Sequence, residues 1–434
     1  MRYTLGFAIV AVAASASAQA PPIDIATART YFDEVRQLSA ADGGHLWGRP
    51  VAGPMLFVDP ETGFIVANRA DKDGQFKSQD GVWVGKLPDG MVPANTGMDV
   101  GGTRWAMIMW PVPDNRYARR RLLMHESFHR IQDSLRIPGM NPSNAQLAGA
   151  DGRIWLRLEF RALTEALLRN GEERRQAVHD ALVFRAKRHS LFPASASDEE
   201  RQLELNEGLA EYTGFVLSGL PRAVLADRAA IQLAQQEQQE SQSRSFAYAS
   251  GPAYGLLLDA SGIPWRAKIV ASSDLSAMTG AAYNLGNISA AGAESLVDKY
   301  SGARMVAAEK TREATRIAQE ARLRARFLES ATLTLPVASR FNFSFDPNGA
   351  VPLSGLGTVY ESSRVSDEWG TLDVSGGGVL IRRNETGRIT SVVVSSPTVK
   401  DRTVEGEGWK LTLAPGWTVT ESTARGQMTV SHQQ

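Results

Sequence analysis

Apolar and polar positions follow different periods in successive parts of the chain, and these periods predict its elements. Residues 26–40 have apolar positions at helical spacing, whereas residues 54–68 have the pattern of two short strands joined by a Pro-Glu-Thr-Gly turn. Residues 82–88 and 103–113 have the composition of further strands. We therefore predict a mixed α/β N-terminal lobe over residues 21–119.

The next part of the chain, residues 120–300, is predicted to be mostly helical. Residues 151–170 and 172–192 both repeat apolar positions at a helical period. After the break at Pro-Ala-Ser-Ala-Ser, Ser197 and Glu200 have the spacing of a capping box, which predicts that Ser197 begins the next helix. His179 and His189 lie on charge-rich stretches, where solvated positions are expected.

A third pattern begins near residue 300. Residues 303–329 form a long, charged segment with few large apolar positions, which predicts a connecting helix over 301–330 with solvated faces. From residue 331 to 434 short alternating stretches are separated by Asp-Pro-Asn-Gly, Asn-Glu-Thr-Gly and Pro-Gly turn signals, which predicts an all-β accessory module. The predicted fold class is therefore α+β.

Residues 1–20 have the pattern of a cleaved secretory signal. Arg2 provides the positive start, an apolar run extends from Leu5 to Ala14, and the segment ends in Ala18-Gln19-Ala20. An N-terminal membrane anchor is the alternative, but this run is short for spanning a bilayer. We therefore predict an exported protein, periplasmic or extracellular, with no stable membrane insertion after cleavage.

The composition narrows the chemistry that the chain can perform. The 434 residues have a formal net charge of zero, 43% apolar and 22% charged residues, so neither nucleic acid nor an anionic membrane surface is indicated as a partner. Cysteine is absent, which excludes a cysteine nucleophile and cysteine metal ligands. A bound metal would have to be held by His, Asp or Glu.

The stretch His125-Glu-Ser-Phe-His129 is the strongest candidate for such a site. On a helix, one stripe beside the two histidines is apolar and contains Met124, Phe128, Ile131 and Leu135. Histidines at i and i+4 lie on one helix face and can both reach one tetrahedral Zn²⁺, and Glu126 between them is placed to act as general base. The alternative is a structural pair of partly buried histidines.

A catalytic zinc ion needs a third protein ligand. The metzincin pattern is excluded, because Gln132 and Leu135 stand where its Gly and third His would be. Residues 205–214, Leu-Asn-Glu-Gly-Leu-Ala-Glu-Tyr-Thr-Gly, offer carboxylates instead: we predict that Glu207 binds zinc and that Glu211 accepts the free N–H of a ligand histidine. A row of solvated glutamates, with Glu204, is the alternative interpretation.

Gly208 lies within the same stretch and would lower helix propensity. Because glycine has no side chain, we expect Gly208 to let this helix approach the HESFH helix closely.

HExxH followed by Asn-Glu-x-x-x-Glu resembles the signature of the gluzincin metallopeptidases, which include thermolysin-like and aminopeptidase-N-like enzymes. Asn206-Glu207-Gly208-Leu-Ala is similar to the NEGFA segment of the aminopeptidases, and Tyr248-Ala-Ser-Gly251, before a helix opening at Pro252, is similar to their YEKG segment. The resemblance covers about residues 100–260 and implies a zincin-like catalytic core, with Tyr248 stabilising an oxyanion; Tyr254 on the same helix is the alternative. The resemblance also implies that Glu207 is the third ligand. It matches Glu211 to the acid that accepts a hydrogen bond from a ligand histidine in thermolysin-like enzymes.

The resemblance has limits. His129 and Glu207 are separated by 78 residues, a longer interval than in those families, and the GxMEN exopeptidase motif is absent. The resemblance therefore leaves endo- and exopeptidase cleavage open.

We expect a secreted zinc metallopeptidase that cleaves a peptide or protein substrate, with Glu126 as general base. Residues 103–113 have two equally favoured interpretations, the edge strand that binds extended peptide and a plain core strand. His45 is a weaker site candidate. The alternatives are a non-catalytic zinc protein that binds through its β module, and a zinc amidase acting on a non-protein amide.

Overall fold

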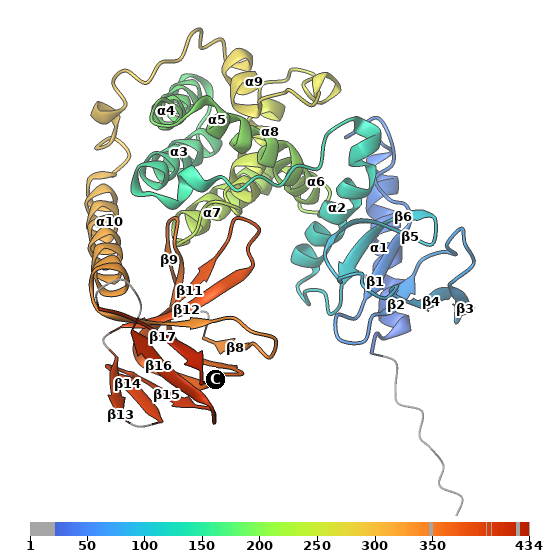
Figure 1. Ribbon diagram of the computed structural model, residues 1–434. Coiled ribbons are helices and arrows are strands. Elements are labelled where there is room, and N and C mark those ends of the chain that lie inside the picture. The colour runs from blue at the N-terminus through green and yellow to red at the C-terminus, as the bar shows by residue number, and fades with distance from the viewer. Residues whose placement is uncertain (1–21, 347–349, 396, 401, 422–425, 434) are drawn as a thin grey trace, which may run out of the picture. The chain divides into compact units, whose positions relative to one another are not determined.

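The computed structural model describes residues 22–433 except 347–349, 396, 401 and 422–425. Contacts within the chain divide it into two units, Met1–Ala307 and Ala308–Gln434. The first unit contains a sheet and a helical part, and the second is rich in strands (Figure 1). The fold class is α+β, which confirms the prediction. The predicted signal at 1–20 lies outside the described residues.

The first unit begins with a helix and a six-stranded sheet. Their bounds are α1 (Ile25–Asp42), β1 (Met55–Val58), β2 (Phe64–Ala67), β3 (Lys77–Gln79), β4 (Val82–Lys86), β5 (Thr96–Val100) and β6 (Thr103–Met109). The strand order is β3-β4-β2-β1-β6-β5, and only the pair β1–β6 is parallel. The predicted hairpin over 54–68 is present as β1 and β2.

The position of β6 decides between the two interpretations of residues 103–113 in favour of a core strand. β6 lies between β1 and β5, so the segment 103–113 does not supply the edge strand. The two edge strands are β3 and β5, and β5 is the one beside β6. The sequence pattern did not predict β5, because Thr-Gly-Met-Asp-Val lacks a regular alternation of apolar residues. The apolar run of β6 has the buried environment of an interior strand.

Both faces of this sheet are covered. On one face Phe57 stacks on Phe32 of α1, with ring centroids 4.9 Å apart, and this face joins the main core. The other face packs Leu56, Ile65 and Trp105 into a separate apolar cluster. The sheet is thereby a rigid platform beside the helix that carries His125.

The helices follow the sheet. Their bounds are α2 (Arg116–Gln132), α3 (Ala150–Leu168), α4 (Gly171–Ser190), α5 (Ala194–Leu203), α6 (Leu209–Val216), α7 (Leu225–Glu237), α8 (Ala247–Ala260) and α9 (Leu275–Ala282). Short 3₁₀ turns lie at Asp133–Leu135, Ala145–Ala148, Arg222–Val224, Arg266–Lys268 and Glu294–Leu296. A π turn, η3 (Glu204–Gly208), joins α5 directly to α6.

Two predicted helix starts are wrong. α5 begins at Ala194 after Pro193, and the Ser197 hydroxyl bonds to the Ala194 carbonyl from inside the helix. Glu200 is not part of a capping box but is fully buried. α8 begins at Ala247, so Pro252 lies inside it rather than at its start.

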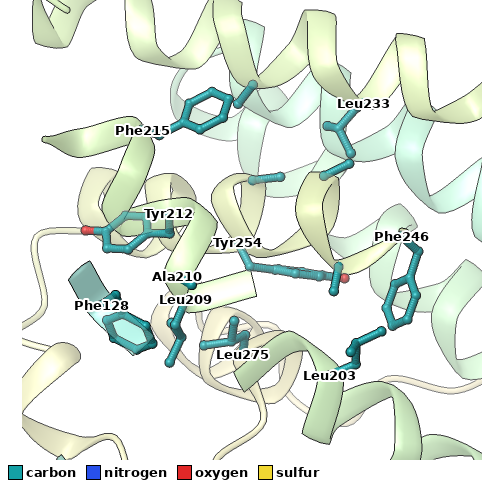
Figure 2. Close-up of a cluster of buried hydrophobic side chains, with 14 of the residues drawn as sticks. Phe128, Leu203, Leu209, Ala210, Tyr212, Phe215, Leu233, Phe246, Tyr254 and Leu275 are labelled. Carbon is teal, nitrogen blue, oxygen red and sulfur yellow. The ribbon is translucent and has the colours of Figure 1, made fainter. Parts of the chain in front are cut away.

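Glycines let α6 and its neighbours approach closely. A Cβ on Gly251 of α8 would lie 2.2 Å from the Gly208 Cα. Gly208 therefore contacts α8, whereas the predicted contact was with the HESFH helix. The close contact with α2 is made by Gly214, where a Cβ would lie 2.6 Å from the Arg121 carbonyl oxygen. The side chains of Phe128, Leu209 and Tyr212 lie in one buried cluster between these helices (Figure 2).

The second unit contains most of a long helix and eleven strands among the described residues. The helix α10 (Ala303–Arg324) continues into a π turn, η7 (Ala325–Glu329). The strands are β7 (Thr332–Pro336), β8 (Asn342–Phe345), β9 (Ala350–Leu353), β10 (Gly357–Asp367), β11 (Gly370–Arg383), β12 (Ile389–Ser395), β13 (Thr398–Lys400), β14 (Thr403–Gly406), β15 (Trp409–Leu413), β16 (Trp417–Glu421) and β17 (Gln427–His432). The main path of their sheet is β13-β14-β15-β11-β12-β7-β17-β16, and β10 pairs with β8, β9 and β11.

The charged helix and the β-rich segment agree with the predicted elements. α10 is mostly exposed and has ion pairs between neighbouring turns, such as Arg316 with Glu313 and Glu320. Among the described residues, no helix has both the length and the apolar composition that crossing a membrane requires.

Candidate metal centre

The helix α2 presents His125 and His129 on one face. It begins at an N-cap, Asn115, whose side chain accepts hydrogen bonds from two backbone N–H groups of the first turn. Met124, Phe128 and Ile131 are buried as predicted, whereas Leu135 lies beyond the end of α2 and is only partly buried. The two imidazole Nε2 atoms lie 3.1 Å apart.

The π turn brings Glu207 to the same point. Its Oε2 lies 3.4 Å from His125 Nε2 and 3.5 Å from His129 Nε2. In a tetrahedral zinc site with bond lengths of about 2.0–2.2 Å, neighbouring donor atoms lie about 3.3–3.6 Å apart. Two imidazoles and a carboxylate are suitable zinc ligands. The two distances to Glu207 fall in this range, and the 3.1 Å between the imidazoles is slightly shorter.

Partners on the far side of each ring orient the two imidazoles. His125 donates its Nδ1–H to Glu211 Oε2 at 2.8 Å, and His129 donates its Nδ1–H to Gln132 Oε1 at 2.8 Å. When an imidazole is neutral and carries its proton on Nδ1, its Nε2 lone pair faces Glu207, and this is the form that binds a metal. A carboxylate or carbonyl behind each histidine is the usual arrangement around a bound metal.

A chain of amides connects His129 to Glu207. Gln132 Nε2 donates to Asn206 Oδ1 at 2.8 Å, and Asn206 Nδ2 donates to Glu207 Oε1 at 3.0 Å. Neither amide was predicted as a site residue from the sequence pattern. Gln132 lies three residues after His129 on the same helix face, and this spacing is the signal that could have identified it.

The other oxygen of Glu211 is held by two further side chains. Glu211 Oε1 lies 3.3 Å from Arg121 Nε and accepts from Gln232 Nε2 at 3.3 Å. Gln232 also donates to the Tyr248 carbonyl at 2.6 Å. Because Pro252 has no N–H to satisfy the carbonyl four residues earlier, Pro252 leaves that carbonyl available to Gln232.

Glu126 lies on α2 close to His125 and His129, and all three are residue types that can bind a metal ion. Donor atoms of His125, Glu126 and His129 lie within 4.8 Å of one another, and Glu126 Oε1 is 3.9 Å from His125 Nε2. Glu126 Oε2 is buried and has no hydrogen-bond partner among the described residues. Burial raises the pKa of Glu126, although the neighbouring imidazoles oppose this shift.

The carboxylates at this site favour a positive charge among them. Burial lowers the pKa of His125, but hydrogen bonds to Glu207 and Glu211 outweigh burial and raise it to about 10. Burial opposes ionisation of Glu207 and Glu211, yet hydrogen bonds from the imidazoles hold both carboxyl pKa values below their ordinary range. A protonated imidazole thus fills the role that a metal cation would fill, and the residues fit a bound divalent metal ion.

Tyr248 lies at the site, whereas Tyr254 and His45 do not. The Tyr248 hydroxyl donates to Glu207 Oε2 at 2.6 Å, and its ring stacks on His125 with centroids 5.6 Å apart. Tyr254 is buried and donates to Glu159, which excludes it as the alternative. His45 lines a different pocket, with Trp47 and Ile137.

The candidate ligands line a cleft of about 750 Å³. One wall is the edge strand, represented by Thr96 and Gly97, and the floor is the His125–His129 face of α2. A Cβ on Gly97 would lie 2.8 Å from the His129 carbonyl oxygen, so glycine allows β5 to lie against the active face of α2. An extended chain could pair with the outer side of β5.

Comparisons of this chain with protein-family models, with curated proteins and with solved structures found no match. The candidate site therefore has to be interpreted from its own geometry.

Proposed function

We propose that this protein is an exported zinc metallopeptidase of gluzincin type. The observation that carries the proposal is the convergence of His125 Nε2, His129 Nε2 and Glu207 Oε2 within 3.1–3.5 Å of one another, beside a buried carboxylate oxygen of Glu126 without a partner. Three protein ligands with a free carboxylate beside them are typical of a catalytic zinc site, whereas a structural site is usually closed by four protein ligands.

Each residue has a distinct task in this proposal. A zinc ion would supply Lewis-acid chemistry, lowering the pKa of a water molecule and polarising a carbonyl oxygen. Glu126 accepts the proton from the water and passes it to the leaving nitrogen. Its raised pKa brings proton affinity closer to neutral pH, which suits a group that must both accept and donate. Tyr248 is the candidate donor to the developing oxyanion.

Two alternatives to a peptidase remain. The same residues would also hydrolyse a non-protein amide, and a zinc protein that binds a partner without catalysis is the other alternative. The edge strand β5 beside the ligands favours an extended peptide over a compact amide, because its outer backbone groups can pair with another chain. The unpartnered Glu126 oxygen favours catalysis over a purely structural role.

The proposal is tested by comparing Glu126→Gln with Glu207→Gln. Both substitutions remove one buried carboxylate of the same cluster, so each controls for the other. We expect Glu126→Gln to retain one zinc ion per chain and to lose about 10²–10⁴-fold in the rate of peptide cleavage. Glu207→Gln should instead lose most of the zinc. Metal content by atomic spectroscopy and cleavage of a broad fluorogenic peptide library would be measured on the same preparations.

Retained peptide cleavage by the Glu126→Gln protein would contradict the general-base role. Unchanged zinc content in the Glu207→Gln protein would mean that the third ligand lies elsewhere. A wild-type protein that holds zinc but cleaves neither peptides nor small amides would support the non-catalytic alternative.

A further inference from the structure

The cleft beside the candidate ligands contains two arginines that differ in how their charges are used. Arg104 lies 2.9 Å from Asp99 and 3.4 Å from Asp133, so two carboxylates balance its charge. Among the described residues Arg121 approaches one carboxylate, Glu211, at 3.3 Å, and Glu211 also accepts the His125 proton. Arg121 therefore contributes positive charge to the cleft that this shared carboxylate balances only in part.

The guanidinium of Arg121 is held in a fixed place. Its Nη1 donates to Gln232 Oε1 at 2.6 Å, and the group lies 5.3 Å from the centre of the Phe215 ring. Its stem is confined by α6, because a Cβ on Gly214 would lie 3.0 Å from the Arg121 Cγ. These contacts restrict a side chain that is otherwise costly to order.

One end of this guanidinium remains available. No partner of Nη2 is found among the described residues, although Nε and Nη1 both have one. The side chain is 39% exposed and lines the cleft. An arginine that is held at two nitrogens and open at the third can bind an anionic group with little further loss of entropy.

The position of Arg121 on α2 sets its distance from the reacting bond. Arg121 lies four residues before His125, which is about 6 Å along the helix axis. An extended peptide advances about 3.3 Å per residue. A group bound by Arg121 would therefore belong to a residue one or two positions from the bond at the metal, on the side away from β5 and His129.

We propose that Arg121 is a specificity-determining residue that binds a substrate carboxylate one or two residues from the cleaved bond. The inference rests on the proposed function, since it uses the metal centre as the point of cleavage. A divalent metal ion and Arg121 together balance the three carboxylates Glu126, Glu207 and Glu211, so an added carboxylate is not repelled by a net negative site. Charge-assisted pairing with a guanidinium then favours it over a neutral group.

A terminal carboxylate and an acidic side chain offer the same chemistry, and three probes distinguish them. The probes are peptide hydroxamates of one sequence: one ends in a free carboxylate, one ends in a carboxamide, and one ends in a carboxamide but has Asp at the second residue. Their affinities for the zinc-loaded protein would be measured by calorimetry. We expect one of the two carboxylates to bind at least about tenfold more tightly than the neutral probe.

Variants of Arg121 test whether this residue causes the preference for a carboxylate. Arg121→Met keeps the apolar stem and should reduce the ratio of carboxylate to neutral affinity to about one, whereas Arg121→Lys should restore part of it. Arg104→Gln is the matched control, because it removes a cleft arginine whose charge is already balanced, and it should leave the ratio unchanged. A merely structural role of Arg121 would weaken all three probes equally.

Each outcome is decisive. Equal binding of the three probes to the wild-type protein, or a preference that persists in Arg121→Met, would overturn the inference and leave the proposed function intact. Failure of the zinc-loaded protein to bind any hydroxamate would show that the metal is closed to substrates, which overturns the proposed function and this inference with it.

Discussion

Two clusters of buried carboxylates lie on either side of the π turn η3, and they differ in what neutralises them. The metal cluster contains Glu126, Glu207 and Glu211 with His125 and His129. The arginine cluster contains Glu159, Glu200 and Glu204 with Arg185 and Arg188. Glu204 and Glu207 come from the same π turn, so three residues of sequence separate one environment from the other.

In the arginine cluster every carboxylate has a fixed cation. Arg185 lies 2.6 Å from Glu204 and 3.1 Å from Glu159, and Arg188 lies 2.6 Å from Glu159 and 2.8 Å from Glu200. The hydroxyls of Tyr254 and Ser250 add hydrogen bonds to these carboxylates.

In the metal cluster the direct partners of Glu207 are two imidazoles, a phenol and an amide. One oxygen of Glu126 has no partner among the described residues. The carboxylates of the first cluster are paired with arginines of the fold, although Arg185 Nε has no partner among the described residues, whereas the second cluster is suited to a cation from solution.

The largest expected effect comes from breaking the arginine cluster. Arg185→Met leaves Glu204 and Glu159 buried without one of their cations, which should lower the free energy of unfolding by about 3–5 kcal/mol. Glu126→Gln is the matched control, because it removes a buried carboxylate that lacks a full set of partners, and it should leave stability unchanged or raised. Urea unfolding of the metal-free proteins measures both. Equal losses in the two variants would mean that the clusters do not differ in this way.

A smaller effect is expected from the residues behind the imidazoles. Glu211→Gln and Gln132→Ala each remove a partner of a ligand histidine, and each should weaken zinc binding about 10–100-fold. Competition with a chelator of known affinity would measure the change. Tyr254→Phe removes a comparable hydrogen bond from the arginine cluster, and it should lower stability without changing zinc affinity. If Tyr254→Phe weakened zinc binding as much, the two clusters would act as one unit.

The parts of the site that lie on regular helices were accessible from sequence. The spacing of His125 and His129 follows from the period of a helix. The four-residue spacing also predicted Glu211 beside Glu207, although Glu207 lies in the π turn η3 and not in a regular helix. The structure brings these residues together, although a metal role for each stays a prediction. The α+β class was likewise visible in the change from helical to alternating periods.

The remaining features depend on tertiary contacts that the local pattern does not contain. The segment 172–192 is rich in charge, which predicted solvated positions for its histidines, yet Arg185 and Arg188 are buried. Their charges are matched by carboxylates from other helices, and His189 Nε2 lies 2.9 Å from Glu200. Burial of a charge by a distant partner has no signature in a hydrophobic period.

Helix boundaries failed for a related reason. Ser197 and Pro252 are typical residues at helix starts, but α5 and α8 begin earlier because tertiary packing extends them. The carbonyl that Pro252 leaves free is satisfied by Gln232, a residue of α7. Likewise, a glycine at position 208 predicts that another helix lies close, but the sequence does not show which helix it is.

The smallest expected effect, taken per pH unit, is a difference in how pH acts on the two clusters. The pKa of His125 in the metal-free fold is raised from 6.5 to about 10. A raised pKa means that the stabilisation is fully present below about pH 6.5 and is lost as the pH rises toward 10. Between these limits the native state holds one more proton than the unfolded state, so stability should fall by at most about 1.4 kcal/mol per pH unit.

Glu200 and Arg188 of the arginine cluster should not contribute to this pH dependence, whereas burial raises the pKa of Glu204 despite the neighbouring Arg185. The neighbouring arginines hold the carboxyl pKa of Glu200 well below its ordinary value despite burial, and the carboxylates keep the pKa of Arg188 above its own, so neither group titrates between pH 6.5 and 10. Urea unfolding at pH 6.5, 8 and 9.5, with a chelator or with saturating zinc, would separate the two contributions. We expect the metal-free protein to lose stability across this range and the zinc-loaded protein to lose less, because zinc replaces the His125 proton. Parallel losses with and without zinc would show that His125 is not the group that exchanges a proton for the metal.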